Sequence, residues 1–272
     1  RGILHKSSSS FSLFSLPPFH IPYFIIIPKG KRKKMRPKIY LFGDSITEMS
    51  FDDGGWGASL VKHFNRTVDV VLRGYSGYNT RWALKVLNKV FGESKELESP
   101  LAVTVFFGAN DACLADRCSA FQHVPVDEYK NNLHSIVSFL KGRWPTTEVI
   151  LISPPPIDEP SRLLYPFTEN KLGLPERTNE AAGNYAKACL AVAAECGVSA
   201  VDLWTRFQQI PGWQTACLSD GLHLSQTGNR IVFEEVIGAL KKKGLSLETL
   251  PVDLPDISVI DPNDPLKSFE GI

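Results

Sequence analysis

Five short apolar segments, each followed by a helical pattern, recur along most of this chain. Continuous apolar runs are typical of strands buried on both faces of a parallel sheet, and the helical patterns provide the crossovers that parallel strands need. The sequence therefore predicts a three-layer α/β/α sandwich with a doubly wound, flavodoxin-like sheet of five mostly parallel strands. The expected strands are 38–42, 68–72, 101–107, 148–153 and 200–203, and the expected helices cover 60–64, 83–90, 129–140 and 181–192, with a last helix from about residue 225.

A serine follows the first predicted strand directly. Residues 38–42 run into Gly43, Asp44 and Ser45, which read as a tight turn at the carboxyl end of that strand. In open α/β sheets ligands bind in the crevice outside those ends, so Ser45 is well placed to act as a nucleophile. Taken alone, the same three residues are also typical of an ordinary turn or helix N-cap.

Other strands are followed by residues that could assist a nucleophilic serine. Gly74 follows the second predicted strand and Asn110 the third, and the ends of parallel strands meet at one edge of the sheet. The backbone N–H groups of Ser45 and Gly74 and the side-chain amide of Asn110 are therefore candidate oxyanion-hole donors. Asp220 precedes His223 by three residues, a spacing that lets the carboxylate bind imidazole Nδ1–H and leaves Nε2 as the base for Ser45.

Each of these residues also has a structural interpretation. Gly74 could serve only a turn, Asn110 could bind its own backbone in a loop, and Asp220 with His223 could cap the last helix. Their combined position after the expected elements favours the catalytic interpretation.

Some residues and motifs offer alternatives that the sequence supports less well. His123, in a predicted loop, is an alternative base, and Cys113 and Cys118 are alternative nucleophiles without a His–carboxylate pair nearby in sequence. Thr47 stands where the GxSxG motif of α/β-hydrolases requires glycine. The sequence has no GxGxxG, P-loop, HExxH or CxxC motif, so we expect no cofactor, no metal site and five free thiols.

Four sequence blocks together resemble the SGNH, or GDSL, hydrolase family. They are Gly43-Asp44-Ser45, Gly74 in RGYSGYNT, Gly108-Ala109-Asn110-Asp111 and Asp220-Gly221-Leu222-His223-Leu224. The long first block and RGYSGYNTRWAL look closest to the isoamyl-acetate-hydrolysing esterase branch and its plant relatives. The resemblance implies a metal-free serine esterase for small, short-acyl esters, with a Ser45, Asp220 and His223 triad and with Ser45, Gly74 and Asn110 as the oxyanion hole.

The substrate cannot be read from these blocks alone. Trp56, Tyr78 and Trp82 are candidate substrate-binding residues by position, although aromatic residues often serve only as core. The long segment 157–176 shows no clear period and could shape the substrate entrance. A carbohydrate O-deacetylase, a thioesterase or a lysophospholipase could use the same triad, and a catalytically inactive binding module is the alternative of another class.

The distribution of charge suggests three regions. Residues 1–34 carry seven Lys or Arg and no acid, and Met35 follows them, so we expect a disordered leader or an artefactual extension. The hydrolase domain is predicted over 35–246, and an acidic, Pro-containing tail over 247–272. The chain after residue 34 has a net charge near −6, which gives no reason to expect nucleic-acid binding.

The longest apolar run of the leader, 21–27, is too short to span a membrane. We expect a cytoplasmic protein, or an organellar or secreted one if residues 1–34 are a genuine targeting segment. The oligomeric state cannot be predicted.

Overall fold

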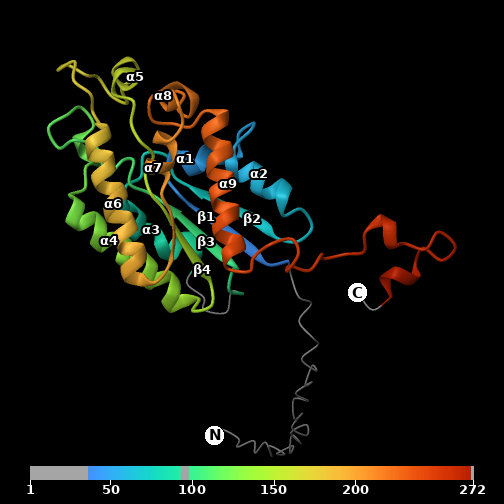
Figure 1. Cartoon of the computed structure of the whole chain (residues 1–272). Coiled ribbons are helices and arrows are strands. Elements are labelled where there is room, and N and C mark those ends of the chain that lie inside the picture. The colour runs from blue at the N-terminus through green and yellow to red at the C-terminus, as the bar shows by residue number, and fades with distance from the viewer. Residues whose placement is uncertain (1–35, 93–97, 271–272) are drawn as a thin grey trace, which may run out of the picture. The chain divides into compact units, whose positions relative to one another are not determined.

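A sheet of five strands forms the centre of the protein, whose computed structural model describes residues 36–92 and 98–270. All neighbouring strands are parallel and their order is β2-β1-β3-β4-β5, which confirms the predicted doubly wound, flavodoxin-like sheet. Figure 1 shows the strands between two layers of helices. The strands are β1 (Lys38–Gly43), β2 (Asp69–Gly74), β3 (Ala102–Phe106), β4 (Glu148–Ile152) and β5 (Ser199–Val201).

The register of the strands sets the place of the site. Gly43 at the end of β1 pairs with Gly74 of β2 on one side and with Phe106 of β3 on the other. The segments that leave these strands therefore start from one edge of the sheet. The sheet also changes its winding direction between β1 and β3, and such a switch point is where open α/β sheets bind ligands.

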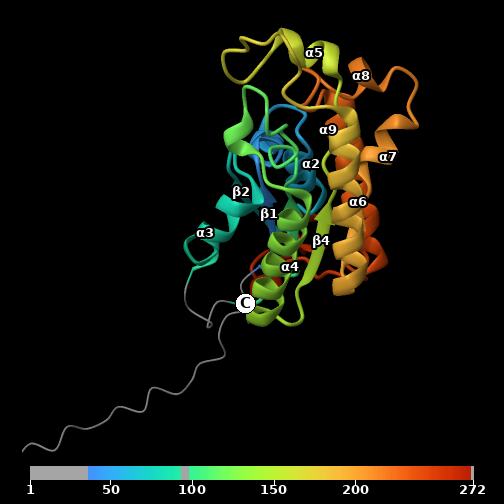
Figure 2. The ribbon, with the colours of Figure 1, turned by 90° about the vertical axis from the view of Figure 1, so that its left-hand side faces the viewer.

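The central strands β1, β3 and β4 bury both faces, as their continuous apolar character predicted, whereas the edge strands β2 and β5 are partly exposed. Ile39 and Leu41 of β1 point into one core with helices α2 (Trp56–His63) and α9 (Gln226–Lys242), whereas Phe42 points into the opposite core. That second core is covered by α3 (Thr80–Phe91), α4 (Val126–Arg143) and α6 (Asn179–Cys196). Figure 2 shows α4 and α6 lying side by side over their face of the sheet.

Three of the long helices begin where the sequence provides side-chain caps. Asn79, Thr178 and Ser225 accept hydrogen bonds from the first-turn N–H groups of α3, α6 and α9. Ser225 thus starts the last helix as predicted, and Gly244 follows its end with a φ of +75°.

Several short elements were not predicted. Helix α2 begins at Trp56, four residues before the predicted helix 60–64, and Val61 within it is 42% exposed. Strand β5 ends before Leu203, because Asp202 accepts a hydrogen bond from Thr205 N–H and starts a new helix. The short helices are α1 (Ser45–Glu48), α5 (Glu159–Leu164), α7 (Leu203–Gln208) and α8 (Trp213–Ala216), and the 3-10 turns are Met49–Phe51, Ala120–Gln122, Ile257–Val259 and Lys267–Phe269.

The three predicted regions are described to different extents. The predicted leader, residues 1–34, lies outside the described residues. The part of the tail up to Glu270 is described and is mostly exposed. Asp253 connects it to the rest of the domain, because its carboxylate accepts a hydrogen bond from Arg36 and its N–H donates to the Arg66 carbonyl.

All five cysteines are free thiols. Among the described residues, no helix is long and apolar enough to cross a membrane.

Candidate active site

Ser45 is the first residue of α1, directly after the turn that ends β1. The Asp44 carboxylate caps this helix by accepting the Ile46 N–H at 3.0 Å. Since the first N–H groups of a helix have no partner inside it, the Ser45 amide remains available as a donor. The Ser45 side chain is nearly buried, and its Oγ lies 2.9 Å from His223 Nε2.

Asp220 and His223 complete a line of hydrogen bonds that starts at Ser45. His223 Nδ1–H donates to Asp220 Oδ2 over 2.8 Å, while Asp220 Oδ1 accepts the backbone N–H groups of Leu222 and His223. Burial by itself would raise the pKa of the Asp220 carboxyl, but the hydrogen bonds from His223 and the charges of His223 and Arg162 hold it well below its usual range. Asp220 is therefore a carboxylate that fixes the tautomer of His223.

Asn110 presents its amide from the segment after β3. Its Oδ1 accepts hydrogen bonds from Arg177 Nη2 (3.0 Å) and Gln122 Nε2 (3.2 Å), and its Nδ2 donates to the Tyr78 carbonyl (2.9 Å). These contacts set which end of the amide is oxygen and which is nitrogen. The second N–H of Nδ2 is then left for another acceptor.

Gly74 does not lie in the cleft beside Ser45, contrary to the sequence-based expectation. It is the last residue of β2, and a Cβ there would come within 2.1 Å of the Glu48 backbone nitrogen. The packing of β2 against α1 thus requires that Gly74 has no side chain. Gly77, three residues later with a φ of +79°, lines the cleft instead, and its N–H has no acceptor among the described residues.

A cleft of about 130 Å³ opens above the serine. Apolar side chains close some of its sides. The polar residues that line it are Ser45, Ser76, Asn110, Gln122, Arg162, Arg177 and His223. Residues of both kinds that define its shape are Ser45, Asn110, His223, Met49, Phe167 and Leu222.

The three aromatic candidates from the sequence lie outside the set of residues that line the cleft. Trp56 is fully buried and its Nε1–H donates to the Ile46 carbonyl at 3.2 Å, so it supports α1 from the core. Tyr78 contributes its carbonyl to Asn110 and its ring to a neighbouring hollow. Trp82 stacks on Phe121, and Phe121 contacts the cleft residue Phe167.

The alternative nucleophiles and the alternative base have other partners. Burial raises the pKa of the Cys113 thiol to about 12, and the Cys113 carbonyl accepts a hydrogen bond from His123 Nδ1 at 2.6 Å. The Cys118 thiol faces the Glu176 carboxylate at 3.7 Å. Within 36–92 and 98–270, no three His, Cys, Asp or Glu side chains gather into a possible metal-binding group.

Four buried residues that the sequence did not single out surround the site: Gln122, Arg162, Glu176 and Arg177. Apart from Gln122, they belong to the long segment after β4 or directly follow it. Their only signal in the sequence was the unusual length of that segment, because charged residues in a loop normally lie in solvent.

The profile of the GDSL-like lipase/acylhydrolase family matches residues 39–236. The chain belongs to this family. A GDSL esterase/lipase of Arabidopsis thaliana is 68% identical over 238 residues, which cover 87% of this chain and 99% of that protein. The isoamyl acetate-hydrolyzing esterase 1 homolog of Rattus norvegicus is 46% identical over 237 residues, covering 86% of this chain and 92% of the rat protein.

A solved structure supports the same assignment. The lipase/acylhydrolase from Enterococcus faecalis superposes with a TM-score of 0.60 at 27% identity, covering 79% of this chain and 98% of that one. These matches confirm the family, the fold and the esterase branch predicted from the four sequence blocks. As a GDSL-family enzyme, the protein is a hydrolase of carboxylic esters.

Proposed function

We propose that this GDSL-family enzyme hydrolyses esters of short acyl groups through an acyl-enzyme on Ser45. The observation that carries the proposal is the continuous line from Ser45 Oγ to His223 Nε2 (2.9 Å) and from His223 Nδ1 to Asp220 Oδ2 (2.8 Å). A hydroxyl, an imidazole and a carboxylate in this order provide a nucleophile, its base and the group that stabilises the imidazolium.

In the first half-reaction Ser45 Oγ attacks the carbonyl carbon of the ester and His223 Nε2 takes the hydroxyl proton. The developing oxyanion accepts hydrogen bonds from the amides of Ser45 and Gly77 and from Asn110 Nδ2. The imidazolium then gives its proton to the leaving alcohol, and the acyl group stays on Ser45. In the second half-reaction His223 deprotonates a water molecule that attacks the acyl-enzyme. The imidazolium then returns the proton to Ser45 Oγ as the carboxylic acid leaves.

The size of the cleft supports short acyl groups. A cavity of about 150 Å³ accommodates benzene, and the cleft above Ser45 is of similar size, about 130 Å³. Pockets for drug-sized ligands are usually larger, about 300–1,000 Å³. The relatives named as isoamyl acetate-hydrolyzing esterase homologs agree with a small ester as the substrate.

The test is turnover of p-nitrophenyl esters with acetyl, butanoyl and octanoyl groups. We expect Ser45→Ala to lower kcat/KM by about 10⁴-fold or more on each ester, and the native enzyme to prefer the two shorter esters. Ser76→Ala is the matched control, because Ser76 lines the same cleft but its hydroxyl contacts no histidine in the described structure. Full activity of folded Ser45→Ala protein would reject the nucleophile, and a preference for the octanoyl ester would reject the short-acyl assignment.

A further inference from the structure

Three charged residues beside the catalytic cleft are almost completely buried. The exposed fractions are 3% for Arg162, 1% for Glu176 and 2% for Arg177. Removing ionised side chains from water costs several kcal/mol each unless close partners compensate. The partners of these three side chains therefore determine which parts of the site they hold in place.

Arg162 reaches the acid of the proposed triad. Its Nη1–H donates to Asp220 Oδ2 at 2.9 Å, the same oxygen that accepts His223 Nδ1–H, and its Nη2–H donates to Glu176 Oε1 at 2.6 Å. The position of Asp220 Oδ2 is thus fixed from two directions, by the imidazole and by Arg162.

Arg177 reaches the proposed oxyanion hole. Its Nε–H donates to the Ala109 carbonyl at 2.8 Å, and Nη2–H donates to Asn110 Oδ1 and to Gln122 Oε1, both at 3.0 Å. Gln122 in turn donates to Asn110 Oδ1. The backbone before Asn110 and the oxygen end of its amide are both held, so Nδ2 is kept on the side of the cleft.

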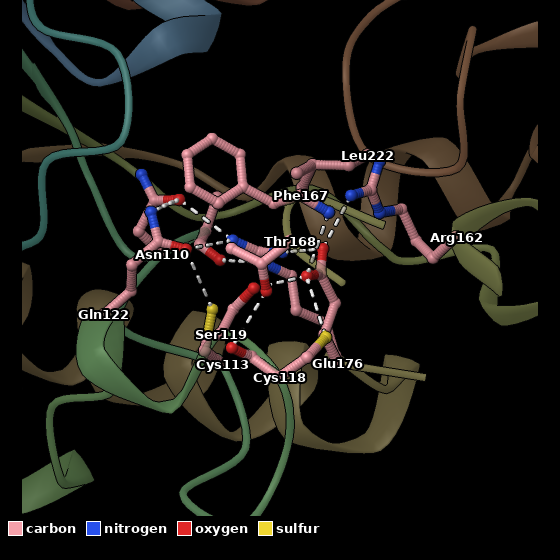
Figure 3. A network of polar contacts seen from close by, with 12 residues as sticks. Asn110, Cys113, Cys118, Ser119, Gln122, Arg162, Phe167, Thr168, Glu176 and Leu222 are labelled. Atoms are coloured by element: carbon pink, nitrogen blue, oxygen red, sulfur yellow. Dashed lines mark hydrogen bonds and ion pairs between the residues drawn. The ribbon is translucent and has the colours of Figure 1, made fainter. Parts of the chain in front are cut away.

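Glu176 joins the two arginines. Its Oε1 accepts hydrogen bonds from Arg162 and Arg177, and its Oε2 accepts the Ser119 hydroxyl and the Phe167 N–H. Figure 3 shows Glu176 within this network of polar contacts, with Asn110 and Arg162 on opposite sides. Although burial would raise the pKa of Glu176, the charges of Arg177 and Arg162 and the hydrogen bond from Ser119 lower it, so the carboxylate remains ionised.

We propose that Arg162, Glu176 and Arg177 form a positioning unit that aligns Asp220 with His223 and Asn110 with the oxyanion at the same time. The inference rests on the proposed function, because it assigns these residues to the support of the proposed triad and oxyanion hole. Phe167 extends the unit to the wall of the cleft, since Glu176 holds its backbone N–H. In this proposal the three residues act through Asp220 and Asn110, although Arg162 and Arg177 also line the cleft.

Two substitutions separate the two ends of the unit. We expect Arg177→Met to lower kcat by about 10²-fold with little change in KM, the effect of losing one oxyanion donor. Arg177→Lys should recover little of the lost kcat, since one ammonium cannot replace three diverging N–H groups.

Arg162→Met should lower kcat by about 10- to 100-fold by displacing Asp220. It should also move the downfield proton resonance of His223 Nδ1, whereas Arg177→Met should leave that resonance in place.

Thr147→Val controls for general loss of packing, because it removes a buried hydrogen bond to the Pro100 carbonyl far from the cleft. It should leave kcat and the His223 resonance unchanged at a temperature where all variants are folded. If Arg177→Met does not fold, Arg177→Lys, which keeps the buried charge, provides the same measurement.

Labelling with a phosphonate that reacts with active serines distinguishes a failure of this inference from a failure of the proposed function. Labelling of Ser45 in the native enzyme, together with wild-type kcat in the folded arginine variants, would overturn the positioning unit alone. A His223 resonance that moved equally in both arginine variants would also overturn it. If the phosphonate failed to label Ser45, the proposed function would be lost and the inference with it.

Discussion

Two irregular segments of this enzyme place their charged side chains in opposite environments. The segment after β4, from Ile157 to Arg177, and the C-terminal tail, from Leu247 to Glu270, both contain prolines, a short helical turn and several exposed apolar side chains. The first segment buries Arg162, Glu176 and Arg177 beside the cleft. The tail keeps its ion pairs at the surface, where Arg36 meets Asp253 and Arg66 meets Asp256.

This difference in burial shows that the role of a segment cannot be predicted from its lack of regular secondary structure. Surface ion pairs contribute little to stability, because water and salt weaken them. A buried group of charges is tolerated only with closely matched partners, and it then fixes the geometry of everything it contacts. We therefore expect the first segment to be sensitive to the loss of one charge and the tail to be insensitive.

The largest effect is expected for Glu176→Gln. This change leaves Arg162 and Arg177 buried without their shared carboxylate, and removal of one partner from a buried ion pair typically costs about 3–5 kcal/mol. Urea unfolding at neutral pH measures the loss. Glu235→Gln is the control, because Glu235 forms a partly exposed pair with Arg206. If Glu176→Gln and Glu235→Gln lowered the free energy of unfolding equally, buried and exposed charges would not differ in their effect on stability, and the prediction would be wrong.

A smaller effect, dependent on pH, is expected for Asp111→Asn. Asp111 is fully buried like Glu176, but it accepts hydrogen bonds from the neutral Thr80 instead of from arginines. Burial raises its pKa to about 7, and the pKa of the nearby Asp44 is raised to about 7 in the same way.

Because the pKa of Asp111 is higher in the folded protein than in the unfolded chain, its contribution to stability is complete below about pH 4 and is lost as the pH rises through 7. The shift corresponds to at most about 4 kcal/mol at about 1.4 kcal/mol per pH unit. Asp111→Asn should flatten the decline of the free energy of unfolding between these pH values. A decline as steep as in the native protein would show that Asp111 does not take up a proton on folding.

The smallest effect is expected for Asp253→Asn in the tail. Its partner Arg36 also contacts Asp69, and both partners are accessible to water. The urea midpoint and kcat/KM should therefore equal those of the native enzyme. A marked loss of stability would mean that the tail is as firmly integrated as the segment after β4, and the comparison would fail.

The sequence predicted those features that depend on local pattern. The apolar runs identified all five strands, and the strand ends identified Ser45 and Asn110. The three-residue spacing identified Asp220 and His223, which the structure places in a line of hydrogen bonds with Ser45. The positions of Ser45 and Asn110 follow from topology, since parallel strands bring their carboxyl ends together whatever lies between them.

Features that depend on how the folded chain places side chains in space could not be predicted from local sequence patterns. Gly74 was chosen because it follows β2, but the turn continues for three more residues before Gly77 reaches the cleft. Trp56 is a candidate by its position near the strand ends, yet its ring packs against α1 and donates a hydrogen bond to the Ile46 carbonyl. Arg177 contacts Asn110 across 67 positions of sequence, and no local pattern marks such a pair.

The close packing of Gly74 against α1 affects how genetic data on this enzyme should be interpreted. Any side chain at this position would collide with the backbone of Thr47 and Glu48, and the short helix that carries Ser45 would have to move. A random mutagenesis screen would therefore report residue 74 as indispensable for turnover even though it is not among the residues that line the cleft. Loss of activity in such a variant would report the displacement of Ser45. A structure of the inactive variant would distinguish this displacement from the loss of a catalytic group at residue 74.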